Sequence, residues 1–341
     1  MSIEIGGSSI GEVYLGNDAI SEIYKGDDLL WSAYTPEINY IFRDIDENGN
    51  LTKGTGVLED ASEIVKIGYF GLIYAFYKHS NINGNVYFPN LKSINSEGAF
   101  YSTFYQCTNL TSASFPNLAT INGGIAFYST FYQCTNLTSA SFPKLTTING
   151  STSFDNAFYG CTSLSNLDLS SLVTINGDFC FRSAFQGCTS LSNLDLSSLV
   201  TIASSNHQSV FYAAFASCTN LSSLNFSSLT TVGNSCFFDA FFGCTKLTSV
   251  TFPKLTNIKE SSCFCRCFYN CTSLESLSFP SLTSTSFGEH NDQFANMLRG
   301  VTGCTVHFPS NLQSVIGSWP DVTGGFGGTN TTVLFDLPTT E

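Results

Sequence analysis

Cysteine is the residue type in this sequence with the widest choice of chemistry. The 341 residues include 13 Cys, and eight of these stand directly before a threonine. The eight are Cys107, Cys134, Cys161, Cys188, Cys218, Cys244, Cys271 and Cys304. A disulfide framework is typical of short secreted chains. One cysteine every 26 to 33 residues instead indicates a repeated position, so we expect a ladder of buried, reduced thiols that act as small hydrophobic side chains.

A metal site or a catalytic site finds little support in the remaining residues. The stretch "CFCRC" at 263–267 holds three nearby thiols, but no second Cys/His cluster at zinc-site spacing completes it. The four histidines are scattered, and no H-E-x-x-H, G-x-S-x-G or phosphate-binding glycine loop occurs. They are His79, His207, His290 and His307. We therefore expect no catalytic residue, no metal and no cofactor.

The segment "DIDENGN" at 44–50 begins like a calcium-binding loop. Asp44, Asp46, Asn48 and Gly49 match the D-x-D-x-N-G start of that motif. The closing glutamate would fall at position 55, which is Thr55. We therefore interpret the segment as a hairpin turn between "NYIFRDI" and "NLTKG".

Repeats within the sequence indicate which structural elements hold the cysteines and the other candidate residues in place. The eighteen residues "AFYSTFYQCTNLTSASFP" occur at 99–116 and again, letter for letter, at 126–143. The segment "CTSLSNLDLSSLVTI" occurs at 161–175 and again at 188–202. Identical neighbouring segments need equivalent environments, which only a repeat protein provides. In L-x-x-L-x-L the last two leucines predict a short strand with both facing inward.

The remainder of each unit has helical spacing. Phenylalanine stands seven and three residues before the repeated cysteine, so Phe, Phe and Cys fall at i, i+4 and i+7. This spacing predicts one face of a short helix, with two stacked phenyl spines between helices and sheet. Positions −8 and −4 carry mostly small residues and positions −6 and −2 often bulky ones such as Tyr105 and Tyr132. We expect the bulky side of one helix to pack on the small side of the next.

Composition excludes several classes of partner. Net charge is −13 with only 13 Lys and Arg, which argues against nucleic-acid binding. No run of about 18 apolar residues exists, so we expect no membrane insertion. The start "MSIEIGGSSI" lacks the basic and apolar stretches of a secretory signal. We expect the chain to fold in the compartment where it is made.

The pattern F-x-x-C-T-x-L-x-x-x-x-F-P-x-L-x-x-I, for instance at 104–121, resembles the BspA-like leucine-rich repeats of bacterial surface proteins. That resemblance implies an α/β solenoid of about 27-residue units, each a short strand plus a short helix, and an association with adhesion. Residues 1–33, with turns at Gly16-Asn17-Asp18 and Gly26-Asp27-Asp28, resemble N-terminal β modules of tailed-phage virion proteins. We expect this attachment module at 1–33, a β-hairpin linker or cap at 34–69, the repeat array at 70–303 and a C-terminal cap at 304–341.

We expect a ligand to bind at the outward-facing positions of the strands, which form a polar and nearly uncharged surface. The candidate contact residues for a sugar or peptide are Asn166, Asp168, Asn193, Asp195, Ser223, Asn225 and Thr251. The outer tyrosines are interpreted as packing. The leading hypothesis is a non-enzymatic phage virion protein, folded in the host cytoplasm. It would join other virion proteins through residues 1–33 and recognise a host protein or glycan, and a homo-oligomer fits as well. The alternatives are a BspA-like bacterial surface adhesin and, third, a polysaccharide-modifying enzyme, for which clustered carboxylates are absent.

Overall fold

The computed structural model describes most of the chain from residue 67 to residue 338, with gaps at 68–70, 79, 81, 83, 203–208, 260–261, 287–292, 319–321 and 323. Within residues 1–32 it describes the backbone of six short strands. The turn expected at 44–50 and His79, His207 and His290 therefore lie outside the described residues. So do the linker expected at 34–69, apart from Ile67, and the first residue of the array expected at 70–303.

The six N-terminal strands form three antiparallel pairs. In the second pair Leu15 faces Asp18, and in the third Lys25 faces Asp28. Of the two predicted turns, Asp18 and Asp28 lie in strands, and the other residues lie outside the described set. The strands are β1 (Ile3–Ile5), β2 (Ser8–Ile10), β3 (Tyr14–Leu15), β4 (Asp18–Ala19), β5 (Glu22–Lys25) and β6 (Asp28–Ser32).

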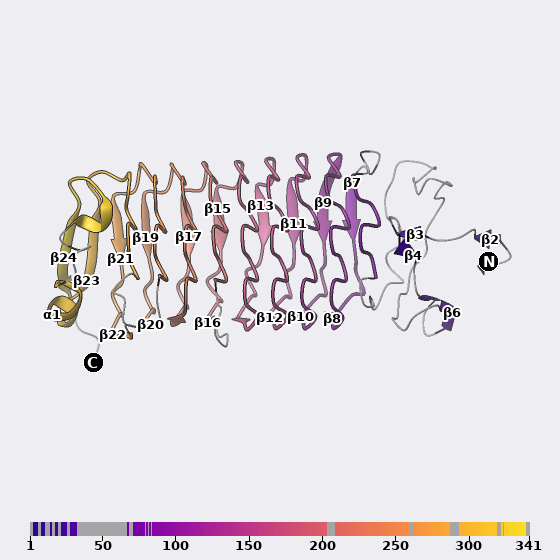
Figure 1. Ribbon diagram of the computed structural model, residues 1–341, viewed down its shortest axis with the longest axis horizontal. Helices are drawn as coiled ribbons and strands as arrows, with labels where there is room; N and C mark the ends of the chain where they lie inside the picture. Colours follow the sequence, from indigo (N-terminus) through magenta and orange to yellow (C-terminus); the bar gives the residue numbers. More distant parts are fainter. Residues whose placement is uncertain are drawn as a thin grey trace.

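From residue 71 onward the chain winds as a solenoid of stacked coils (Figure 1). One side of the stack is a continuous parallel sheet of eight strands, in which consecutive coils pair in register, Thr120 with Thr147 and Thr147 with Thr174. Its strands are β8 (Ser93–Ile94), β10 (Thr120–Ile121), β12 (Thr147–Ile148), β14 (Thr174–Ile175), β16 (Thr201–Ile202), β18 (Thr231–Val232), β20 (Asn257–Lys259) and β22 (Ser284–Ser286).

A second side carries the strands predicted from the L-x-L step. They form three parallel ladders, of which the first joins the first four strands, the second the next two, and the third the remaining three with the terminal β24. They are β7 (Gly84–Tyr87), β9 (Leu110–Ser114), β11 (Ser139–Ser141), β13 (Asn166–Asp168), β15 (Asn193–Asp195), β17 (Ser223–Asn225), β19 (Ser249–Thr251), β21 (Ser276–Ser278) and β23 (Thr305–Pro309). The predicted solenoid of about 27-residue units is thus confirmed.

The helix predicted for each unit is wrong. The segments that hold the two phenylalanines and the cysteine are runs of turns, which we call the turn ribbon. Every fourth residue of the ribbon has positive φ, as at Ser102 (48°), Gln106 (55°) and Gly160 (68°). A non-glycine residue in this left-handed conformation costs about 1–2 kcal/mol. A compensating interaction is therefore required at each coil.

Hydrogen bonds between coils supply that compensation. Within one coil the N–H groups of Tyr101 and Thr103 bond to carbonyls three residues back, at 3.0 and 3.2 Å. The alternate N–H groups of Phe100, Ser102 and Phe104 donate instead to the next coil, at 2.7 to 2.9 Å. A helix would direct all of these bonds along its own axis. The turn ribbon divides them, so the third side of the solenoid is also held by backbone bonds between coils.

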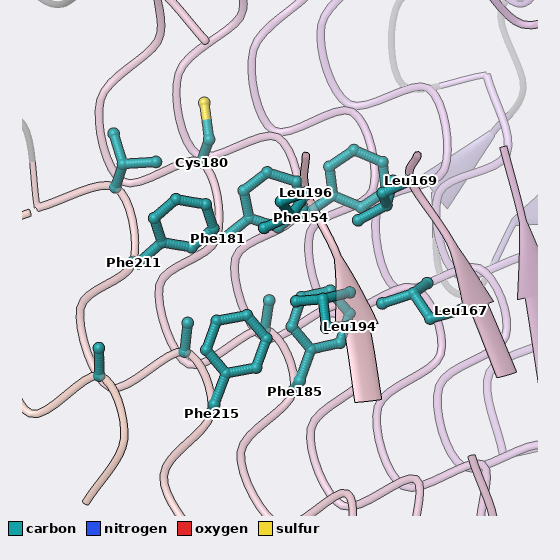
Figure 2. Close-up of a cluster of buried hydrophobic side chains, with 14 of the residues drawn as sticks. Phe154, Leu167, Leu169, Cys180, Phe181, Phe185, Leu194, Leu196, Phe211 and Phe215 are labelled. Atoms are coloured by element: carbon teal, nitrogen blue, oxygen red, sulfur yellow. The ribbon is translucent and has the colours of Figure 1, made fainter. Parts of the chain in front are cut away.

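The interior is a set of columns, each filled by the same position of successive coils. Both predicted phenyl spines are present: Phe100, Phe127 and Phe154 continue one, and Phe104, Phe131 and Phe158 the other, with centroids 4.8 to 5.5 Å apart. A third spine follows the F-P step and meets the first edge-on, as Phe115 meets Phe100 at 83°. Leu169 and Leu196 interrupt the third spine (Figure 2).

Bulky residues pack on bulky residues of the next coil, and small residues pack on small ones. The expected packing of bulky against small residues is therefore wrong. Because neighbouring strands pair without a shift, outer tyrosines stack on the tyrosine of the next coil where that coil carries one, as in Tyr101 on Tyr128. The rings of Tyr105 and Tyr132 lie 4.6 Å apart and are tilted by only 2°. Small positions likewise lie over small positions, as Ala99 and Ala126, which are both fully buried.

The predicted ladder of buried, reduced thiols is confirmed. All 13 cysteines are thiols rather than disulfides, and only Cys265 is not buried. The structure adds a bond that the sequence does not indicate: the ladder thiols from Cys107 to Cys271 each donate to the carbonyl of a phenylalanine in the preceding coil. Cys134 Sγ, for example, lies 3.0 Å from the carbonyl oxygen of Phe104. The column is therefore both apolar filling and a coil-to-coil hydrogen-bond donor.

The segment after β23, residues 310–338, falls within the cap expected at 304–341, and we refer to it as the cap. It contains the 3-10 helices η2 (Ser310–Leu312) and η3 (Gly325–Gly327), the single-turn helix α1 (Gln313–Ile316) and strand β24 (Thr332–Leu337). β24 pairs parallel with β23, and Phe335 stacks on Phe308 with centroids 5.8 Å apart. The phenyl column of the array thus extends into the cap.

Candidate functional site

The seven residues predicted to bind a ligand lie on the second side of the solenoid. Asn193 pairs directly with Ser223, and Asp195 with Asn225, in the ladder of β15 and β17. Asn166 and Asp168 lie on β13, and Thr251 on β19, in the two flanking ladders. All seven are exposed or half-exposed, so their outward orientation is confirmed. Their role in binding stays a prediction.

Three of these residues have a structural task. A side-chain oxygen of Asp168, Asp195 and Asn225 accepts a hydrogen bond from the backbone N–H two residues on, at 3.2, 2.9 and 3.1 Å. Each donor is the N–H of a serine at the position where the other coils carry proline. The three serines are Ser170, Ser197 and Ser227, and the prolines are Pro89, Pro116, Pro143, Pro253, Pro280 and Pro309. Proline has no N–H, so only the serine coils need an Asp or Asn to bond it.

The exchange of proline for serine between coils leads to a prediction about stability. Asp195→Ala should lower the free energy of unfolding by about 1 kcal/mol, because the Ser197 N–H loses its partner. Ser197→Pro should remove most of that loss, since neighbouring coils already accept proline there. A double-mutant cycle followed by chemical denaturation measures this coupling. Equal costs of Asp195→Ala with and without the proline would show that the carboxylate does something else.

Two columns of aromatic rings line the outer surface of the turn ribbon. One runs through Tyr77, Tyr105, Tyr132 and Tyr159, with successive centroids 4.6 to 4.8 Å apart. The interpretation of these tyrosines as packing is correct but incomplete, because the rings are also half-exposed or exposed. Stacking covers their faces, so the ring edges and hydroxyls meet solvent. Partial burial and the neighbouring tyrosine raise the pKa of Tyr105 and of Tyr132, so both hydroxyls keep their proton at neutral pH.

The second outer column changes character midway. After Tyr101 and Tyr128, which stack at 4.8 Å, it continues with Asp155 and Arg182. Arg182 Nε lies 2.8 Å from Asp155 Oδ2, and Asn156 Nδ2 lies 2.7 Å from Asp155 Oδ1. Burial raises the pKa of the Asp155 carboxyl, although the bonds from Arg182 oppose the rise. The pair fills two successive positions of the column, and the Arg182 guanidinium lies over the Phe179 ring.

A shallow trough lined by residues of polar type, which we call the polar trough, lies at the corner that follows the tyrosine column. Its volume is about 570 Å³, and it crosses four coils of the array. Gln106 Nε2 donates to Gln133 Oε1 at 2.6 Å, so the two amides form an ordered row along one wall. The row ends at Gly160, which has no side chain. The lining residues are Lys78, Ser80, Gln106, Thr108, Gln133, Thr135, Gly160 and Thr162.

Reasoning from the sequence alone misses this trough. A signal for it is present in "YQCTN", which occurs at 105–109 and 132–136 and repeats glutamine in the same place, followed by glycine in the next coil. In the expected helix, however, this glutamine is only a residue near the C-terminal end. The stacking of coils in register is what shows that the two amides bond and that Gly160 ends their row.

Reactive and metal-binding side chains do not gather in one place among the described residues. Among them, no three His, Cys, Asp or Glu side chains gather as a metal site would require. Burial raises the pKa of Cys180 and Cys263 to about 12 and that of Cys134 well above its usual value, so these thiols stay protonated. In "CFCRC", Cys263 and Cys267 are buried whereas Cys265 is not. His307 Nδ1 lies 3.0 Å from the Asp336 carboxylate in the cap.

Comparison of the sequence with known protein families identifies the repeat. The profile of the BspA type leucine-rich repeat region matches residues 72–183, 127–267, 182–293 and 238–317, in six copies. The chain belongs to the BspA-type leucine-rich repeat family. These matches fall on the array described above, and together they span more than half of the chain.

Solved leucine-rich repeat structures are also similar to the chain. The leucine-rich repeat protein of T. pallidum is 18% identical, covering 74% of this chain and 93% of that one, with a TM-score of 0.33. One from Bacteroides ovatus is 19% identical, covering 88% and 99%, with a TM-score of 0.31. A leucine-rich cell surface protein of Faecalibacterium prausnitzii is 18% identical, covering 76% and 82%, with a TM-score of 0.22. These low scores carry no argument about function. No curated protein sequence matches the chain.

No described segment forms a helix with the length and apolar character needed to cross a bilayer.

Proposed function

We propose that this BspA-type repeat protein is a non-enzymatic recognition component of a tailed-phage particle. Its solenoid would present a surface to the host cell, and residues 1–33 would attach it to other virion proteins. The observation that carries the recognition role is the exposure of polar groups in registered rows along the array, such as the side-chain amides of Asn95, Asn122 and Asn149, which bond at 2.7 Å. Such rows offer the same groups at each coil to an extended ligand.

The thiols support folding in a reducing compartment. Ladder cysteines of adjacent coils occupy one column, and a chain that folded in an oxidising compartment would present thirteen thiols to mispairing before the coils close. A virion protein folds in the host cytoplasm and leaves the cell by lysis. The antiparallel strand pairs within residues 3–32 are compatible with a separate attachment module.

The experiment separates attachment from recognition. Particles assembled with the full chain and with a variant lacking residues 1–33 are purified and analysed by mass spectrometry. We expect the full chain in the particle and the shortened chain, folded by circular dichroism, in the unbound fraction. Equal incorporation of both would contradict the attachment role. Display of the protein on bacterial cells, with none in particles, would support a BspA-like surface adhesin instead.

A further inference from the structure

We propose that the polar trough is a binding site for a neutral glycan that runs along the solenoid axis across the coils of Lys78, Gln106, Gln133 and Gly160. This inference rests on the proposed recognition function and names the ligand class of that surface. It moves the expected contact from the strand face to the corner between the turn ribbon and the strands.

The charge of the lining residues argues against charged polymers as ligands of the trough. Among the described residues, eight line the trough, and of these Lys78 at one end is the only charged one. A single cation does not hold a nucleic acid or a polyanionic glycan, which need many phosphate or carboxylate contacts. None of the described lining residues is an acid, so a cationic ligand finds no partner among them. The net charge of −13 further disfavours an anion.

The backbone of the trough excludes an added peptide strand. Strand addition needs free N–H and C=O groups at an edge. Here the N–H groups of Gln106, Gln133 and Gly160 already donate to carbonyls of the next coil, at 2.7, 2.7 and 2.8 Å. The part of the lining that the structure describes also has no large apolar side chain that would form a pocket for a peptide's anchor residue. What the wall does offer is side-chain amides and hydroxyls.

Those groups suit a ligand rich in hydroxyls. An amide and a hydroxyl each act as donor and acceptor, as a sugar hydroxyl does. The bond between Gln106 and Gln133 fixes the amide row before a ligand arrives, which lowers the entropy cost of binding. Thr108, Thr135 and Thr162 add one hydroxyl to the lining at each of three successive coils. With coils about 4.8 Å apart, four coils span about 14 Å, which is long enough for more than one sugar ring.

Two substitutions at one repeat position make a matched test. Thr162 is exposed and lines the trough, whereas Thr189 is the same position one coil later and lies outside its lining. Thr162→Trp should fill the trough, and Thr189→Trp should leave it open. Gln133→Leu keeps the size of the side chain and removes the amide. Thermal unfolding of each full-length variant verifies that the array still folds.

The probe is a printed array of neutral gluco-, manno-, galacto- and xylo-oligosaccharides beside sulfated and uronic-acid ones. We expect the full-length protein to bind at least one neutral series and no acidic one. Affinity should fall at least tenfold in Thr162→Trp and in Gln133→Leu, and stay within twofold in Thr189→Trp. Binding to no neutral oligosaccharide, or equal binding by the Thr162 and Thr189 variants, would overturn the proposal.

A parallel measurement of binding to host cells separates this proposal from the function on which it rests. Cell binding that persists in Thr162→Trp, without glycan binding, removes the trough and leaves the recognition function in place. Complete absence of cell binding by the unmodified protein removes the recognition function itself.

Discussion

Gly150→Ala should unfold the middle of the array. A Cβ at Gly150 would lie 1.9 Å from the carbonyl oxygen of Gly123 in the preceding coil, and the contacting atom is backbone. The two coils can accept the methyl group only by separating, which would break the bonds from Asn149 and Gly150 to the Ile121 carbonyl. We expect a loss of free energy of unfolding at or above about 3 kcal/mol, the upper end of ordinary overpacking costs.

Gly124→Ala is the control for that substitution. Its added Cβ would meet Ser151 at 3.4 Å, an ordinary contact, so the loss should stay below about 1 kcal/mol. Chemical denaturation of both variants measures the difference. Equal stability of the two variants would mean that the coils are not held at the spacing described here.

Phe158→Ala should be a costly truncation in the second phenyl spine. Phe158 is 1% exposed and stacks on Phe131 at 5.2 Å and on Phe185 at 5.5 Å. Removing a buried phenyl ring leaves a cavity and costs about 3–5 kcal/mol. Because each coil contacts only its neighbours, the variant should also separate the unfolding of the two halves of the array.

Tyr159→Ala provides the comparison, since it removes the next aromatic ring in the chain from the outer column. That ring is half-exposed and stacks on Tyr132 at 4.8 Å. Its loss should cost about 1 kcal/mol, the value of an aromatic pair beyond its burial. Differential scanning calorimetry distinguishes the two variants. A larger loss for Tyr159→Ala than for Phe158→Ala would contradict the assignment of interior and surface.

The sequence predicts the solenoid, its period and its interior because these depend on which positions repeat. It does not separate a helix from the turn ribbon, because both place Phe at i and i+4 and Cys at i+7 on one face. Glycines such as Gly160 and Gly187, just before the cysteine, are also compatible with both structures. They fit the end of a helix, and they fit the positive φ that the ribbon adopts there, 68° and 75°.

The candidate site is less accessible to prediction from sequence. The register between coils decides whether tyrosine packs on tyrosine or on alanine, and it is set by backbone pairing such as Ser139 with Ser112. By contrast, the exchange of proline for serine together with Asp168, Asp195 or Asn225 is visible in the sequence. Because a serine N–H at a proline position needs an acceptor, that exchange alone is enough to indicate that these side chains form turns.

Counting accessible thiols tests most directly whether the coils stack around a dry interior of phenyl rings and cysteines. The protein, purified without reductant, is treated with a thiol reagent at pH 8 before and after unfolding in denaturant. We expect rapid reaction of Cys265 at most in the folded protein, and of all 13 cysteines once it unfolds. Several reactive thiols in the folded protein, or fewer than 13 after unfolding, would contradict the stacked interior.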